Sequence, residues 1–132
     1  MIRPFVNEFM VKTPSIKEDL AINYPGGYSD LVMRLIRVLS SVDDAGFRPD
    51  PDRITCIDHG DSWKGTALYI IGAQGYQPSV FWSIFVVYGS CLGCDTYEAI
   101  KNYSCDEKLT SRQIDDYWTL MLHMVQSMRL VR

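Results

Sequence analysis

In the first third of the chain, hydrophobic residues recur at three- and four-residue steps, the spacing that predicts helices with one apolar face. Ser15 and Glu18 have the spacing of a capping box, so we expect a short helix over residues 15–22, ended by Pro25 and the two glycines after it. Ser29 is expected to cap a second helix. The apolar stripe of that second helix consists of Leu31, Leu35, Val38 and Val42, with Val32, Ile36 and Leu39 beside it.

The same periodicity returns near the end of the chain, where it predicts a long last helix. Thr110 and Gln113 fit the capping box of its N-terminus, and Asp95 is expected to cap a shorter helix before it that reaches about residue 103. His123 falls on the polar side of the last helix, so we interpret it as a solvated surface histidine. The apolar side consists of Ile114, Tyr117, Trp118, Met121, Val125 and Met128.

Between the helices, the pattern changes to three extended runs rich in β-branched and aromatic residues, which favour strands. The runs cover residues 53–58, 66–71 and 80–88, and glycine-containing turns separate them. A connector rich in proline and glycine, over residues 43–52, precedes them. An antiparallel meander is the simplest pairing of three such consecutive runs.

The predicted fold class is α+β, with a three-stranded antiparallel meander packed against N-terminal helices and a long C-terminal helix. We expect a single domain over residues 1–132, with helices in 1–42, the sheet in 53–88 and helices in 95–130. The run over 80–88 is apolar at successive positions, whereas a half-buried strand would alternate. It is therefore either a central strand covered on both faces, or a strand with one face that meets a partner.

Composition narrows the function classes. The chain has 47% hydrophobic and 22% charged residues, as ordinary globular proteins do, and a net charge of -3 without basic clusters, which argues against nucleic-acid binding. It has no run of about 18 apolar residues, the minimum for a membrane span, and its start, Met1-Ile2-Arg3-Pro4, lacks an apolar signal segment. We therefore expect a cytoplasmic protein with no direct contact to nucleic acid or membrane.

The turn Cys91-Leu92-Gly93-Cys94 is the most distinctive chemical feature, and four interpretations of it stay open. Two thiolates at this spacing form half of a tetrahedral zinc site, for which His59 is the first candidate as a further ligand, ahead of Cys56, Cys105 and His123. The pair could instead be a redox dithiol at a helix N-terminus, or Cys91 a nucleophile with His59 as its base. The fourth interpretation is a buried structural corner, since free cysteine is among the most buried residue types.

Two turns add further candidates. Asp58-His59-Gly60-Asp61 offers two carboxylates and an imidazole for ion binding or acid–base chemistry, although aspartate and glycine there are also typical of a connection between strands. The second turn is Asp61-Ser62-Trp63-Lys64-Gly65. Its Trp63 is the best candidate for an exposed aromatic anchor, because aromatic anchors dominate the binding energy of interfaces.

Three segments carry a resemblance to a known group: Tyr88-Gly89-Ser90-Cys91-Leu92-Gly93-Cys94-Asp95, Asp61-Ser62-Trp63-Lys64-Gly65-Thr66 and Leu122-His123-Met124-Val125-Gln126. Over about residues 54–130 the chain resembles small uncharacterised phage and prophage proteins with a Tyr-Gly-Ser-Cys-x-Gly-Cys-Asp turn. That resemblance implies a phage accessory protein in the host cytoplasm, which acts by binding a host machine, for instance as an inhibitor of CRISPR or another defence system.

We therefore expect a non-enzymatic protein that binds a host protein or protein complex, with a homodimer left open. The alternative is a zinc- or thiol-dependent domain. The expected partner-binding residues are Asp61, Trp63, Lys64 and Asp95, and the expected metal ligands, if zinc is bound, are Cys91, Cys94 and His59.

Overall fold

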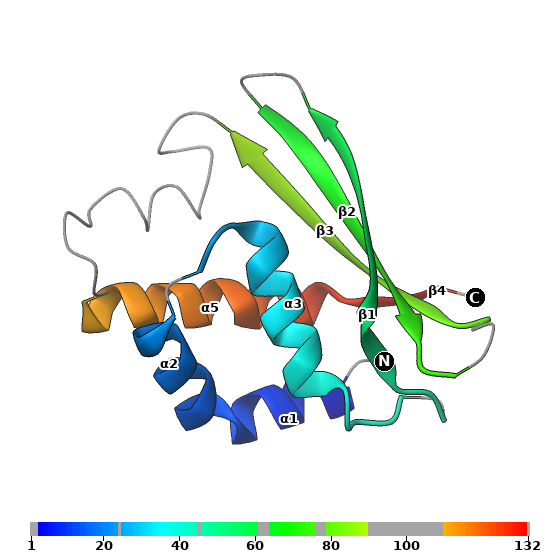
Figure 1. Cartoon of the computed structure of the whole chain (residues 1–132), viewed down its shortest axis with the longest axis horizontal. Coiled ribbons are helices and arrows are strands. Elements are labelled where there is room, and N and C mark those ends of the chain that lie inside the picture. Colours follow the sequence, from blue (N-terminus) through cyan, green and yellow to red (C-terminus); the bar gives the residue numbers. More distant parts are fainter. Residues whose placement is uncertain are drawn as a thin grey trace.

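The computed structural model describes residues 3–23, 25–44, 46–60, 64–75, 79–89 and 110–131. Within these ranges the chain forms four helices and one four-stranded antiparallel sheet (Figure 1). The α+β class and the long C-terminal helix are confirmed, and the sheet has one more strand than the sequence predicted.

The N-terminal part contains α1 (Arg3–Val11), α2 (Thr13–Ile22) and α3 (Tyr28–Leu39). The prediction that Ser15 caps a helix is wrong, because α2 begins two residues earlier, with Thr13 and Pro14 in its first turn and Lys12 at the cap position. Helix α1 was not predicted, although the four-residue spacing of Phe5 and Phe9, both fully buried, is a helical signal.

Ser29 does not cap α3 either, because Gly27 occupies the cap position with a φ of 138°, a conformation that favours glycine. Asp30 supports this helix start, since its Oδ2 accepts a hydrogen bond of 2.9 Å from the Gly26 amide. The predicted apolar stripe is confirmed in most of its members. Leu31, Val32, Leu35, Ile36 and Leu39 are completely buried. Val38 and Val42 are only partly buried, and Val42 lies beyond the end of α3.

The sheet consists of β1 (Pro49–Gly60), β2 (Lys64–Ala73), β3 (Phe81–Gly89) and β4 (Arg129–Val131), side by side in that order. The first three strands form the predicted meander. Strand β1 begins inside the predicted connector, because Pro49 already pairs with Ala73 before a register shift that ends at Ile54. Strand β4 pairs with the first three residues of β3 and replaces the end of the predicted last helix.

Helix α5 (Ser111–Ser127) has the predicted capping box, in which Thr110 and Gln113 bond each other's backbone amides at 3.1 and 2.9 Å. Its residues Tyr117, Met121 and Val125 are buried as predicted, together with Met124, which the prediction omitted. His123 is exposed, as expected.

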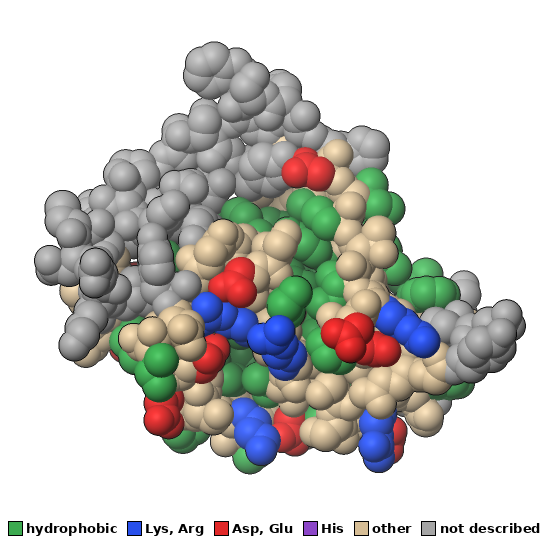
Figure 2. Space-filling view, viewed as in Figure 1, with side chains coloured by type: hydrophobic (Ala, Val, Ile, Leu, Met, Phe, Trp, Pro, Cys, Tyr) green, Lys and Arg blue, Asp and Glu red, His purple; other side chains and the backbone are tan. Residues whose placement is uncertain are grey.

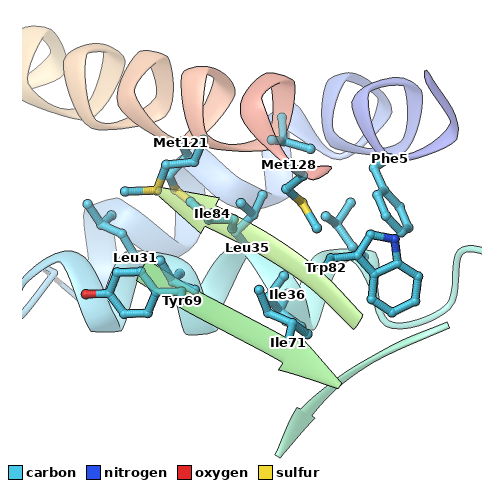
Figure 3. Packing of buried hydrophobic residues seen from close by; sticks show 14 of the residues in the cluster. Phe5, Leu31, Leu35, Ile36, Tyr69, Ile71, Trp82, Ile84, Met121 and Met128 are labelled. Carbon is cyan, nitrogen blue, oxygen red and sulfur yellow. The ribbon is translucent and has the colours of Figure 1, made fainter. Parts of the chain in front are cut away.

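The core lies between the sheet and the helices, which gather on one side of it (Figure 1). Figure 3 shows Met121 and Leu31 from the helices and Tyr69, Ile71 and Ile84 from the strands within this cluster. Alternate strand residues point to opposite faces of a sheet, so each strand here offers only half of its side chains to this core. The other half defines the second face of the sheet.

Candidate functional site

Most residues of the predicted sites lie outside the described residues. This applies to Cys91, Cys94 and Asp95 and to Asp61 and Trp63. The structure describes only the backbone of His59 and Lys64, which lie in β1 and β2. The proposed zinc, thiol and partner-binding roles of these residues therefore stay predictions.

Residues 58–60 are part of a strand and not of a turn, which corrects the turn interpretation of Asp58-His59-Gly60-Asp61. Asp58 pairs with Ala67, His59 with Thr66 and Gly60 with Gly65, so β1 continues to the end of the hairpin. Strand pairing extends this far because β2 is long enough to satisfy the backbone of β1. Among the residues that the structure describes, no three histidine, cysteine or acidic side chains are grouped so that they could hold a metal ion.

The structure instead exposes an apolar surface on the side of the sheet opposite to the helices. In β3, Ile84 is fully buried and Val86 is 7% exposed, whereas their neighbours Phe85 and Val87 are 58% and 60% exposed. These exposed side chains alternate with the buried ones, as the pleat of a strand requires. Strand β3 therefore has one face in the core and one apolar face outside it.

The neighbouring strands extend this surface, which we call the open sheet face. Leu68 of β2 pairs with both Ile57 of β1 and Phe85 of β3, so these three side chains form one row across the sheet. Ile57 is 42% exposed and Leu68 is half-buried. The open sheet face comprises Thr55, Ile57, Thr66, Leu68, Ile70, Phe81, Ser83, Phe85, Val87 and Val131, together with the exposed Arg129, which pairs with Ser83.

A hollow of about 280 Å³ lies at one end of this face. It forms at Gly72, which pairs with Phe81 and has no side chain to fill the space beside Ile70. Arg53 lies at its edge and is held by Asp50 at 3.4 Å and by the Ala73 carbonyl at 2.9 Å. The face thus has protruding side chains at Phe85 and a recess at Gly72.

One polar cluster lies on the helix side of the sheet. The Tyr69 hydroxyl is 3.0 Å from the Ser29 hydroxyl, and this bond joins β2 to α3. Burial raises the pKa of Tyr69 above its ordinary value of 10.0, the Ser29 bond opposes that shift, and Cys56 and Asp58 raise the pKa further. A tyrosine with a raised pKa is a neutral hydrogen-bonding group at physiological pH, so this cluster supports the fold and supplies no base.

The open sheet face can bind a partner by burying its apolar side chains. A patch that includes Phe85 and Val87 gains free energy when it is covered, at about 25 cal/mol per Å² of apolar area removed from water. Contiguous exposed apolar side chains of this kind mark interaction surfaces in many proteins. The sequence signal for this surface is the run of apolar residues on both faces of β3, which only Ser83 interrupts.

None of the helices within the described ranges is both long and apolar enough to cross a membrane. No family model, curated protein or solved structure matches this chain.

Proposed function

We propose that this protein is a non-enzymatic interaction protein, which binds a partner protein through the open sheet face. The observation that carries this proposal is the alternation in β3, where fully buried Ile84 stands next to Phe85, whose exposed fraction is 58%. A side chain as large and apolar as phenylalanine is stabilised when a partner removes it from water.

The shape of the face favours a partner that presents an amphipathic helix. The row from Ile57 to Phe85 spans three strands, which is about 10 Å across at the usual spacing between strands. A helix is about 10 to 12 Å wide with its side chains, so one helix covers the row. Sheets covered by helices on both faces are a common architecture, and such a partner would complete it here.

The resemblance to phage proteins adds the proposal that this partner is a bacterial host protein, such as a component of CRISPR or another defence system. In the sequence, the predicted residues Asp61 and Trp63 lie between β1 and β2, outside the described residues. At this end of the sheet Val87 pairs with Thr66. A surface that combines Trp63 with the open sheet face is therefore part of the proposal.

The test begins with affinity purification from the native host and identification of the captured protein by mass spectrometry. The partner is then purified and its dissociation constant is measured by isothermal titration calorimetry. We expect Phe85→Ser to raise the dissociation constant at least about 30-fold, the effect of losing a hot-spot side chain of roughly 2 kcal/mol. Trp63→Ala tests in the same assay whether the hairpin contributes.

Ile22→Ser is the matched control, because Ile22 is 70% exposed but lies at the end of α2 in the helical layer. It should leave the dissociation constant unchanged. Phe85→Ser should also leave the thermal midpoint of unfolding within a few degrees, since its side chain already contacts water. Equal affinities of the Phe85→Ser variant and the unmodified protein for the identified partner would show that the open sheet face is not the binding surface.

A zinc- or thiol-dependent domain remains the alternative proposal, supported by the Cys-x-x-Cys spacing of Cys91 and Cys94. The zinc content of the purified protein separates this alternative from a metal-free interaction protein.

A further inference from the structure

The two edges of the described sheet are formed by β1 and β4, and they differ in length (Figure 1). Strand β4 has three residues, whereas β1 has twelve, and among the described strands β1 pairs with β2 alone. An edge strand presents a row of backbone N–H and C=O groups with which another strand can pair. The outer edge of β1 therefore offers a long backbone template.

The two halves of β1 differ in how this edge is protected. Prolines, lysines and irregular pairing are devices that prevent edge strands from pairing. The first half of β1 contains Pro49 and Pro51 and the register shift that ends at Ile54. From Ile54 to Gly60 the pairing with β2 is regular, and these seven residues include neither proline nor lysine. The second half of β1 is therefore a regular edge without these devices.

This second half is also exposed on both faces of the sheet. Thr55, Cys56, Ile57 and Asp58 are four consecutive exposed residues, although alternate side chains of a strand point to opposite faces. Figure 1 shows that the half of β1 that ends in the arrowhead extends past the helices. A second strand can therefore approach this edge from outside.

The sequence of the regular edge suits antiparallel pairing with a second copy of itself. A two-fold axis between two antiparallel strands places one residue opposite its own copy. With Ile57 on the axis, every residue of the regular edge finds a partner, and no two like charges lie opposite each other. The opposed pairs are then Ile54–Gly60, Thr55–His59, Cys56–Asp58 and Ile57–Ile57.

Other positions of the axis are less favourable. An axis at Thr55 would place Asp52 opposite Asp58, and an axis at Asp58 would place that carboxylate opposite its own copy. Like charges directly opposite each other destabilise paired strands. An axis at Cys56 would extend the pairing into the irregular first half of β1. Ile57 is thus the centre that uses the whole regular edge.

Pairing about Ile57 also joins the open sheet faces of the two copies. Ile57 is 42% exposed and belongs to the row that continues through Leu68 to Phe85. On the axis it lies beside its own copy, so the two rows become one apolar row. Apolar side chains directly opposite each other stabilise paired strands.

We propose that the protein forms a two-fold symmetric dimer, in which the β1 strands of two copies pair antiparallel about Ile57. Because each copy covers the edge of the other, the assembly closes at two chains. This inference goes beyond the proposed partner-binding function, since it rests on the backbone edge of β1 and not on the open sheet face.

The first test measures the mass of the full chain in solution by analytical ultracentrifugation over a range of concentrations. We expect a monomer–dimer equilibrium. Ile57→Lys should raise the dissociation constant of the dimer at least about tenfold, because it places two like charges opposite each other on the axis. A protein that stays monomeric up to about 1 mM, or an unchanged dissociation constant in Ile57→Lys, would overturn the proposal.

Phe85→Ser is the matched control, since Phe85 lies in the same row as Ile57 but two strands away from the axis. It should leave the dissociation constant of the dimer unchanged, whereas it is expected to weaken binding of the host partner. Failure of the dimer and failure of the proposed function are therefore distinguishable.

The second test determines the register. Residues directly opposite each other in an antiparallel pair have Cα atoms about 4.5 to 5.5 Å apart, which suits a disulfide. Ile57→Cys should therefore form an intermolecular disulfide at position 57 under mild oxidation, identified by mass spectrometry. Thr55→Cys is the control, because the two copies of position 55 would lie about 13 Å apart along the strands.

Both substituted positions are exposed, so the variants should fold, and a thermal melt checks this. An intermolecular disulfide at position 57 and none at position 55 is the expected result. A disulfide at position 55 and none at position 57, or no disulfide at either position, would refute pairing about Ile57.

Discussion

The indole Nε1 of Trp82 donates a hydrogen bond of 2.9 Å to Oδ2 of Asp44, in the interior of the protein. Trp82 is fully buried in β3, and Asp44 follows α3, 38 residues earlier in the chain. The Trp82 ring also meets the edge of the Phe5 ring at a centroid distance of 5.6 Å (Figure 3). One side chain of the sheet thus fixes both α1 and the segment between α3 and β1.

Asp44→Ala should lower the free energy of unfolding by about 1 to 3 kcal/mol, because it leaves the buried Trp82 N–H without an acceptor. The measurement is urea denaturation followed by tryptophan fluorescence. Asp44→Asn is the control, since the amide oxygen still accepts the bond and should retain most of the stability. If Asp44→Ala and Asp44→Asn were equally stable, the hydrogen bond would not carry the effect.

The raised pKa of Tyr69 predicts a loss of stability in alkaline solution. Because the folded-state pKa lies above the unfolded value of 10.0, folding favours the neutral phenol. This contribution is fully present below about pH 10 and is lost as the pH rises through the folded-state pKa. The free energy of unfolding should therefore fall as the pH rises above about 10, and fall less in Tyr69→Phe.

The Ser29→Ala variant tests how the Ser29 hydroxyl contributes to the pKa of Tyr69. The Ser29 hydroxyl bond lowers the pKa of Tyr69, so its removal should raise that pKa further and steepen the alkaline loss of stability. Chemical denaturation at each pH gives the free energies. If the free energy of unfolding fell by the same amount in Tyr69→Phe and in the unmodified protein, groups other than Tyr69 would cause the loss of stability in alkaline solution.

The zinc alternative predicts close to one equivalent of zinc per chain in reduced protein purified without chelator, measured by elemental analysis. Cys91→Ser combined with Cys94→Ser should abolish this zinc, because a tetrahedral site cannot lose two thiolates. Ser83→Ala is the control, since Ser83 lies on β3 and is not a candidate ligand, so this variant should retain the zinc. Less than about a tenth of an equivalent in the unmodified protein would remove the zinc proposal, since structural sites bind tightly.

Local patterns predicted several elements because the interactions behind them are local. The capping box of Thr110 and Gln113 joins residues three positions apart, and the stripe of α3 follows from its own helical period. The three runs that became β1, β2 and β3 were found from their composition, and their short connections favoured the antiparallel order. The candidate residues of the Cys91 to Cys94 turn were found from spacing alone, and their roles stay predictions.

Other features depended on residues distant in sequence. Ser29 has the side chain of a helix cap, yet it bonds Tyr69, which is 40 residues away. Strand β4 has three residues, too few for a pattern, and exists as a strand because the edge of β3 offers it backbone partners. The start of β1 at Pro49 likewise depends on its pairing with Ala73.

By itself, the sequence determined the class of the fold, the amphipathic faces of α3 and α5 and the apolar character of β3, because side-chain periodicity and capping act within a few residues. It left two outcomes for β3, burial on both faces or contact with a partner. Only the tertiary structure decided which face of the sheet the described helices cover, since that depends on where distant segments pack. They cover the face of Ile84 and leave Phe85 exposed, and this difference between adjacent residues supports the proposed function.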